Sequence, residues 1–331
     1  MSEANGILIV GELIDARLSS VTSELLNAGG QLAASLGQPL YAVLLGTNLQ
    51  NAAQEAMSNG ASKVFLAEHP LLNEEQVEAH VTALQQVAEQ VQPSILLIGR
   101  TQLGRELGPR LAFRLRVGLA QDAVALTVEP GTQRLLVTRP VYGGNALAVV
   151  TMTGKPQIVT IRPKVFEAAT NDKTTEGELV RVAVEIPNSV VRSRVVERVA
   201  QETAGVKMEE ARVVVGGGRG LGGPAPFAEL EKLAKLLGGA VGASRPACDA
   251  GWIDPRFQIG LTGKTITPEL YIAVAISGAC QHMAGCSGAK VIVAVNHDTE
   301  AEIFKQARYG VVGDWRKIVP AFTEAIRELV S

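Results

Sequence analysis

Cysteine is scarce in this chain. Only Cys248, Cys280 and Cys286 occur among the 331 residues. Three cysteines cannot build a disulfide framework, and their spacing matches no zinc or iron–sulfur pattern. Buried thiols are the simpler interpretation, so we expect no metal site.

An excess of charge of one sign and long apolar runs are lacking too. The 31 basic and 33 acidic residues give a net charge of −2, which argues against a protein that binds nucleic acid or lies on a membrane surface. No apolar run approaches the ~20 residues that span a bilayer, and the amino terminus has no basic segment followed by an apolar one. We therefore expect a cytoplasmic protein without direct membrane insertion.

The first half of the chain alternates aliphatic runs with helical stretches. The aliphatic runs are residues 7–12, 39–46, 62–68 and 94–100. One intervening helical pattern ends at Gly37 and another at Pro93, which are residues typical of helix ends. The alternation predicts a parallel sheet built from βαβ units. Residues 134–152 and 156–164 then suggest a hairpin and edge strands that complete a mixed sheet.

The composition predicts two domains. Hydrophobic residues make up 47% of the chain, and a single core stops growing near ~250–300 residues. We assign residues 1–165 to an α/β domain and residues 166–206 to a polar connector with one possible strand at 179–186. A second α/β alternation occupies residues 207–331. The fold class is therefore α/β, with two doubly wound domains.

A glycine-rich turn opens the second domain. Gly218, Gly220 and Gly223 fit G-x-G-x-x-G between an expected strand and an expected helix, as in dinucleotide-binding folds. A nicotinamide site would want an acidic residue ~20 positions later, where this chain offers Ser244 and Arg245. Arg219 adds a cation within the turn. The pattern suits a pyrophosphate rather than the usual NAD site, and glycines that serve only a tight turn are the alternative.

The other strand ends of this domain are also small or polar. They read "GASRP", "AISGACQH" and "AVNHD". Because the carboxyl ends of parallel strands open onto one crevice, Ser277, Gly278 and the helix that follows predict a second phosphate-binding turn. His282 lies one turn into that helix, beside Gln281. A lone histidine on an apolar helix is more often a satisfied core residue, but this position favours contact with a ligand, and both interpretations stay open.

Several of these segments resemble a known family. "GGGRGLG", "GASRPACDAGW", "IGLTGKTITPELYIAVAISGACQHMAG", "VIVAVNHDTEAEIF" and "ARYGVVGDWRKIVPAFTEAI" occur in the order found in the alpha (large) subunit of electron-transfer flavoproteins, and "RPVYGGNALA" and "TIRPKVF" extend the likeness into the first domain. The resemblance implies a Rossmann-like FAD-binding domain and a partner, the beta (small) subunit, docked on the first domain. It implies a redox carrier between dehydrogenases, such as the acyl-CoA dehydrogenases of fatty acid beta-oxidation, and a quinone reductase or other acceptor.

The resemblance also implies a role for each site residue, with none of them catalytic. Arg219 and Ser277 would meet the FAD pyrophosphate with Ser244 nearby, Asn296 and Asp314 would lie toward the adenosine, and Arg245, Thr262 and His282 would surround the isoalloxazine ring. The remaining cofactor-binding residues would be Ile259, Gly260, Leu261, Gly278, Ala279, Cys280, Gln281 and Trp315. The chain departs from the family pattern at Leu261, usually glutamine, at Ala275, usually glycine, and at Cys280, commonly aliphatic.

The sequence leaves two other functions as alternatives, a dehydrogenase and a non-catalytic paralogue. A nicotinamide-dependent dehydrogenase would need the acidic ribose-binding residue that is lacking here. A non-catalytic paralogue with a vacant crevice would leave the strand-end motifs without purpose. The choice between simple electron transfer and flavin-based bifurcation depends on the partner subunit, so the sequence leaves it open.

Overall fold

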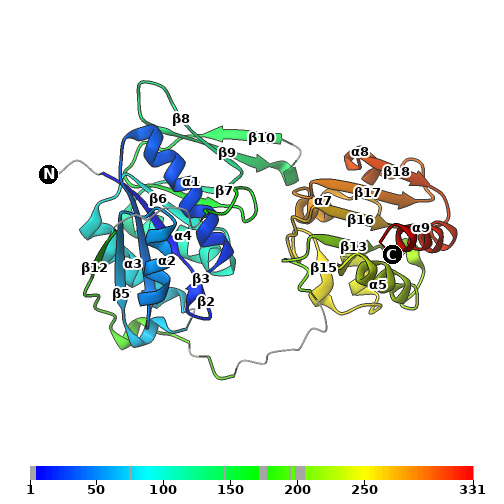
Figure 1. The fold of residues 1–331 in the computed structure, drawn as a ribbon, viewed down its shortest axis with the longest axis horizontal. Coiled ribbons are helices and arrows are strands. Elements are labelled where there is room, and N and C mark those ends of the chain that lie inside the picture. The colour runs from blue at the N-terminus through cyan, green and yellow to red at the C-terminus, as the bar shows by residue number, and fades with distance from the viewer. Residues whose placement is uncertain are drawn as a thin grey trace. The chain divides into compact units, whose positions relative to one another are not determined.

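The computed structural model describes residues 5–74, 76–144, 146–170, 177–193, 195–197 and 206–330. The chain divides into two compact units (Figure 1). One comprises Met1–Pro140 and Leu147–Arg198, and the other comprises Val141–Ala146 and Val199–Ser331. Residues 171–176, 194 and 198–205 of the expected connector lie outside the described residues.

The first unit is built on a seven-stranded sheet of order β12-β5-β4-β1-β6-β11-β7. Its strands are β1 (Ile7–Gly11), β4 (Leu40–Gly46), β5 (Lys63–Glu68), β6 (Ile95–Gly99), β7 (Leu119–Ala123), β11 (Gln157–Ile161) and β12 (Glu178–Arg181). Every described pairing between them is parallel. The parallel sheet predicted from the first half of the sequence is confirmed.

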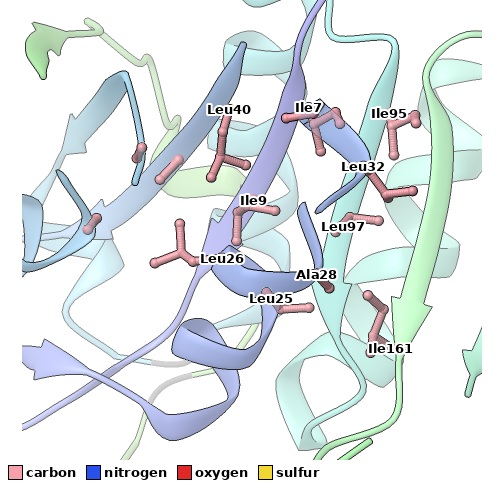
Figure 2. Close-up of a cluster of buried hydrophobic side chains, with 14 of the residues drawn as sticks. Ile7, Ile9, Leu25, Leu26, Ala28, Leu32, Leu40, Ile95, Leu97 and Ile161 are labelled. Carbon is pink, nitrogen blue, oxygen red and sulfur yellow. The ribbon is translucent and has the colours of Figure 1, made fainter. Parts of the chain in front are cut away.

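Two pairs of helices cover the two faces of this sheet. They are α1 (Ser20–Leu36), α2 (Gln50–Ser58), α3 (Val77–Val91) and α4 (Gln102–Leu115). α1 and α2 pack against one face through a core that includes Ile9, Leu25 and Leu97 (Figure 2). α3 and α4 pack against the other face, which makes the unit doubly wound. α1 begins after Ser19, whose hydroxyl accepts from Thr22 N, and ends at Gly37 with φ 63°, as the sequence predicts.

The expectation for residues 134–164 is wrong in part. β9 (Leu135–Val141) and β10 (Ala146–Val150) do leave the main sheet as a hairpin, but with β8 (Ala125–Val128) they form a separate three-stranded sheet. β11 is an interior strand, parallel to both neighbours, and all five of its residues are buried. A strand covered on both faces reads as a continuous apolar run, so the main sheet is parallel rather than mixed in its described pairings.

Only the first half of the possible strand at 179–186 is a strand, β12. β12 pairs with β5 at the sheet edge, and the following residues Val182 and Ile186 are buried in the core shared with α3 and α4. A small hairpin of β2 (Leu13–Ile14) and β3 (Arg17–Leu18) completes the strands described in this unit.

The second unit is also doubly wound. Its six-stranded sheet has the order β15-β14-β13-β16-β17-β18, and every pairing is parallel. The strands are β13 (Val213–Gly217), β14 (Ala240–Ser244), β15 (Gln258–Ile259), β16 (Leu270–Val274), β17 (Val291–Asn296) and β18 (Tyr309–Val312). The helices are α5 (Phe227–Leu236), α6 (Arg245–Asp249), α7 (Cys280–Cys286), α8 (Ile303–Gln306) and α9 (Trp315–Val330). α7 and α8 pack on one face, and α5, α6 and α9 on the other.

Neither a membrane span nor a metal cluster is found in the described part of the chain. None of its helices combines the length and apolar character needed to cross a membrane. Histidine, cysteine, aspartate and glutamate side chains also do not gather there in groups of three or more.

Glu24 gives the first unit a pH-dependent stability. Burial raises the pKa of this carboxyl to about 7, although the backbone N–H of Lys164, 2.6 Å away, acts in the opposite direction. A carboxyl whose pKa is higher in the folded than in the unfolded chain contributes stability at low pH, and this contribution is lost as pH rises toward 7. We expect Glu24→Gln to raise the free energy of unfolding at pH ~8 by about 1–3 kcal/mol and to matter little at pH ~4.

Chemical denaturation at both pH values measures this effect. Glu167→Gln, an exposed carboxyl in the segment after β11, is the matched control. Equal effects of the two substitutions at pH ~8 would contradict the assignment to burial of Glu24.

Candidate functional site

The four polar turns predicted in the second unit meet at one edge of its sheet. β14, β13, β16 and β17 are consecutive, parallel neighbours, so their carboxyl ends lie side by side. Backbone hydrogen bonds join the turns directly: Gly218 N donates to Val274 O at 2.9 Å, and Ala275 N donates to Val295 O at 2.8 Å. Hydrogen bonds therefore join three of the four turns, those after β13, β16 and β17, along this edge.

The first turn differs from the expected strand-to-helix connection. After β13 the chain makes one 3-10 turn, Arg219–Leu221, and α5 begins only at Phe227. A Cβ on Gly218 would overlap the carbonyl oxygen of Ala275, whereas a Cβ on Gly223 would meet nothing. Gly218 is thus required by the close approach of two backbones. The exposed Arg219 side chain has no hydrogen-bond or ion-pair partner within the described residues.

The second turn presents a run of unpaired backbone donors. Gly278 has φ 83°, and a Cβ there would overlap the backbone of Ile303. Ser277 O accepts from Ile303 N at 3.0 Å, which fixes the turn against the start of α8. The N–H groups of Ser277, Gly278, Ala279 and Cys280 have no acceptor among the described residues. Four neighbouring donors at a strand end form a binding surface for an anion.

The loop from Ile259 to Thr262 lies against α7. Leu261 N donates to Gln281 O at 2.7 Å, and a Cβ on Gly285 would overlap the backbone of Gly260. The Leu261 side chain is 68% exposed. Thr262 Oγ1 accepts from Gln258 Nε2 at 3.0 Å, so its own hydroxyl proton stays available for another partner.

His282 is a buried and hydrogen-bonded residue. Its Nδ1 lies 3.2 Å from the carbonyl oxygen of Ile259, and its Nε2 lies 2.8 Å from the Tyr271 hydroxyl. A carbonyl can only accept, so Nδ1 carries the proton and Tyr271 donates to Nε2. Burial lowers the pKa of His282 to about 4, which keeps the ring neutral. This arrangement matches the alternative of a satisfied core histidine, because neither ring nitrogen is left to donate outward.

Ser244 and Arg245 follow β14 on the same edge. Ser244 is buried, and Arg245 begins α6. Arg245 Nε lies 3.3 Å from Asp249 Oδ2, but both side chains are 63% exposed. Such an exposed pair contributes little stability, so the guanidinium is able to change partners.

Asn296, Asp314 and Trp315 lie where β17 and β18 end. Asn296 is buried and donates through Nδ2 to Ile276 O at 2.9 Å, which ties the ends of β16 and β17 together. Asp314 caps α9 by accepting from Arg316 N at 3.0 Å. The Trp315 Nε1 is buried and has no partner within the described residues, so this part of the edge has a spare donor.

Comparison with known proteins decides the family. The description "Electron transfer flavoprotein domain" matches residues 7–187, and "Electron transfer flavoprotein FAD-binding domain" matches residues 207–287. The chain belongs to the electron-transfer flavoprotein alpha-subunit family.

Full-length relatives agree. The electron transfer flavoprotein subunit alpha of Thermoanaerobacterium thermosaccharolyticum is 40% identical over 330 residues, which cover 99% of this chain and 100% of the relative. That of Bacillus subtilis is 42% identical over 323 residues, 98% of each chain. The lactate dehydrogenase (NAD(+),ferredoxin) subunit LctC of Acetobacterium woodii is 38% identical over 316 residues, 95% of this chain and 75% of the relative.

The predictions of family, fold class, FAD as cofactor and electron-transfer function are confirmed. Alpha subunits of electron-transfer flavoproteins pair with a beta subunit. The donor set described above fits the phosphate groups of FAD, because it combines the four unpaired N–H groups after β16 with the guanidinium of Arg219.

Sequence reasoning missed two residues of this edge of the flavoprotein. Tyr271 orients His282, yet in the sequence it is one more apolar position of β16. Arg316 stacks over the Trp315 ring at 4.8 Å, and its Nη2 would lie 3.7 Å from a Cβ on Gly222, so it reaches the first turn. The sequence does contain one indication of Arg316, because this cation lies only two residues after Asp314, which the family resemblance places at the site.

Ala275 gives a test of strain at this edge. It has φ 54°, a left-handed conformation that costs a residue with a Cβ roughly 1–2 kcal/mol. We expect Ala275→Gly to raise the free energy of unfolding by ~0.5–1 kcal/mol, because glycine relieves this strain. The gain is smaller than the strain itself, since the variant loses one methyl contact and glycine has more freedom in the unfolded chain.

Denaturant titration measures this change. The matched control is Ala273→Gly, two residues earlier in β16, where φ is not positive and glycine should destabilise. Destabilisation of similar size by both substitutions would show that Ala275 is not strained.

Proposed function

We propose that the carboxyl edge of the second sheet holds one FAD, non-covalently, and that the subunit ferries electrons between a dehydrogenase and a quinone reductase or another acceptor in the cytoplasm. The observation that carries the proposal is the group of four unpaired backbone donors after β16, on the same edge as the Arg219 cation. When bound, FAD supplies one- and two-electron chemistry that no side chain of this edge can supply.

The phosphate end of the site depends on fixed donors. The N–H groups from Ser277 to Cys280 are held in place by the Gly278 turn and by the Ile303 hydrogen bond. Donors that are already oriented lose little entropy when an anion binds. Arg219 adds a charge-assisted contact from the neighbouring turn. Ser244, Asn296, Asp314 and Trp315 complete the assigned edge, with Asn296 and Asp314 toward the adenosine.

The ring end depends on Arg245, Thr262 and His282. Arg245 keeps its charge at any working pH and favours negative charge on a neighbouring ring. Thr262 has a hydroxyl proton to donate. His282, being neutral and buried, can donate outward only if its bond to Ile259 O is exchanged, so we assign it first to positioning the loop of Ile259, Gly260 and Leu261. Gln281 and Cys280 are exposed beside this loop.

The partners follow from the same assignment. We place the beta subunit on the first unit, whose role is docking, and acyl-CoA dehydrogenases among the donors. The second candidate function is electron bifurcation, in which the complex passes electrons to two different acceptors. It is kept because the name of one relative includes both NAD(+) and ferredoxin. Oxidation of NADH by the purified complex, with its two electrons divided between ferredoxin and a second acceptor of higher potential, would favour that second candidate.

Replacing Arg219 tests the phosphate end. We expect Arg219→Ala to bind FAD about 10- to 100-fold more weakly, because a charge-assisted hydrogen bond contributes roughly 1.5–3 kcal/mol. Flavin retained after dialysis, measured by absorbance, gives the result. Arg212→Ala is the matched control: Arg212 precedes β13 at the opposite edge and pairs with Glu269 at 2.7 Å. Equal retention by both variants would remove Arg219 from the site.

Replacing Arg245 tests the ring end. We expect Arg245→Ala to keep FAD but to lower its reduction potential by about 40 mV, equivalent to ~1 kcal/mol of screened electrostatic energy per electron. Arg245→Lys should restore part of the potential. Asp249→Asn, which removes the facing carboxylate, should shift it upward. An unchanged potential in Arg245→Ala, measured by redox titration, would place this residue away from the ring.

A further inference from the structure

Four arginines gather at the carboxyl edge of the first sheet, in a unit to which no cofactor is assigned. Arg100 directly follows β6, and Arg162 directly follows β11, its neighbour in the sheet. Backbone bonds hold both in place: Arg100 N donates to Ile161 O at 2.7 Å, and Arg162 N donates to Ala123 O at 3.0 Å. Arg105 comes from the first turn of α4, and Arg139 from β9.

One carboxylate lies at the centre of this arginine cluster. Asp122 accepts from Arg162 through both oxygens, at 2.9 and 2.8 Å, and Arg100 Nε lies 3.5 Å from its Oδ1. Asp122 has φ 65°, next to an irregularity in the pairing of β7 with β11. Backbone strain of this kind persists where the surroundings fix it, and it is frequent at binding sites.

The cluster carries more positive charge than this carboxylate neutralises. Arg105 and Arg139 lie close enough for their charges to act on Arg100, and the Arg139 Nε is buried without a partner within the described residues. Glu12 is the next carboxylate along the edge, where its Oε1 accepts from Thr101 Oγ1 at 2.6 Å. Even when Glu12 is counted, this part of the edge carries four arginines and two of the carboxylates named among the described residues.

The base of the cluster is largely buried, whereas Arg105 at its rim is exposed. The side chains of Arg162, Asp122 and Arg100 are only 13%, 15% and 26% exposed. Burial and the neighbouring arginines hold the pKa of Arg100 below its usual value, against the effect of Asp122. Uncompensated charge that is partly removed from water costs free energy until a counter-charge arrives.

We propose that this arginine cluster is a binding site for a small oxyanion of the phosphate class, either inorganic phosphate or the phosphate group of a metabolite. Guanidinium groups present paired donors that match phosphate oxygens. Arg105 and Arg139 supply the donors that Asp122 does not use, and Arg162 and Asp122 form the fixed base of the site. The proposal is independent of the flavin assigned to the second unit.

Thermal unfolding of the flavin-loaded complex with the beta subunit tests the proposal. We expect phosphate, added at constant ionic strength against chloride, to raise the melting temperature by about 2–4 °C when in ~10-fold excess over its dissociation constant. Amide hydrogen exchange should slow in the residues that follow β6, β7 and β11, and not in the second unit. Phosphate and chloride acting equally would overturn the proposal.

Arg139→Met is the decisive variant. It keeps much of the aliphatic side chain, so we expect it to lose the phosphate-dependent shift and, without phosphate, to melt no lower than the parent because charge repulsion is relieved. Arg134→Met, an exposed arginine just before β9, is the matched control and should keep the shift. If Arg139→Met does not fold, the exposed Arg105→Met replaces it.

Three results would count against the site. Loss of the phosphate shift in the Arg134→Met control as well would make the effect a general one of surface charge. The cluster would instead bind an acidic surface of a partner if two results came together: the parent protein does not respond to phosphate, and Arg105→Met associates more weakly with the beta subunit. Retention of the full shift by Arg139→Met would also overturn the assignment.

Discussion

The close approach of the turns after β13 and β16 is the constraint on which the flavin edge depends. Gly218 has no room for a Cβ because the carbonyl of Ala275 lies against it, and Gly218 N is bound to Val274 O. Ala275 accepts a positive φ at this point. That conformation turns the chain away from the sheet, so Ser277 and the residues after it are free of strand pairing. The unpaired donors of the site are therefore a consequence of how two parallel strands end.

A buried polar pair fixes the rest of this edge. Tyr271 lies inside the sheet on β16 and donates to His282 on α7, while His282 donates to Ile259 O, at the end of β15 where the loop begins. Both groups are buried, so an unmade bond would leave a polar atom without water, at a cost of roughly 1–3 kcal/mol. One side chain thus ties a strand, a helix and a loop together, and the loop that carries Leu261 and Thr262 keeps one position relative to the turn at Gly278.

The sequence predicts the local features well and the contacts across the sheet poorly. Gly37 and Pro93 mark helix ends because their effects are local. The sequence predicts an edge position for β11, because the pattern of an apolar run does not say which strands flank it, and only the pairing with β6 and β7 places it inside. The partners of His282 come from residues 11 and 23 positions away, so no periodicity could find them. Gly223, by contrast, fits a motif, but a Cβ there would meet no other atom, so no close approach requires glycine.

The two units show how the same architecture is adapted to different ligands. In each, a parallel doubly wound sheet brings several strand ends to one edge. In the second unit Arg245 follows β14, but the turns after β13 and β16 are rich in glycine, alanine and serine, so backbone N–H groups are exposed and an extended ligand can lie across several turns. In the first, arginine follows two adjacent strands, and long side chains fill the space over the backbone. Backbone donors suit a ligand that spans the edge, whereas a group of guanidiniums with a largely buried base suits a single compact anion. The residue that follows each strand, rather than the fold, decides which chemistry the edge can bind.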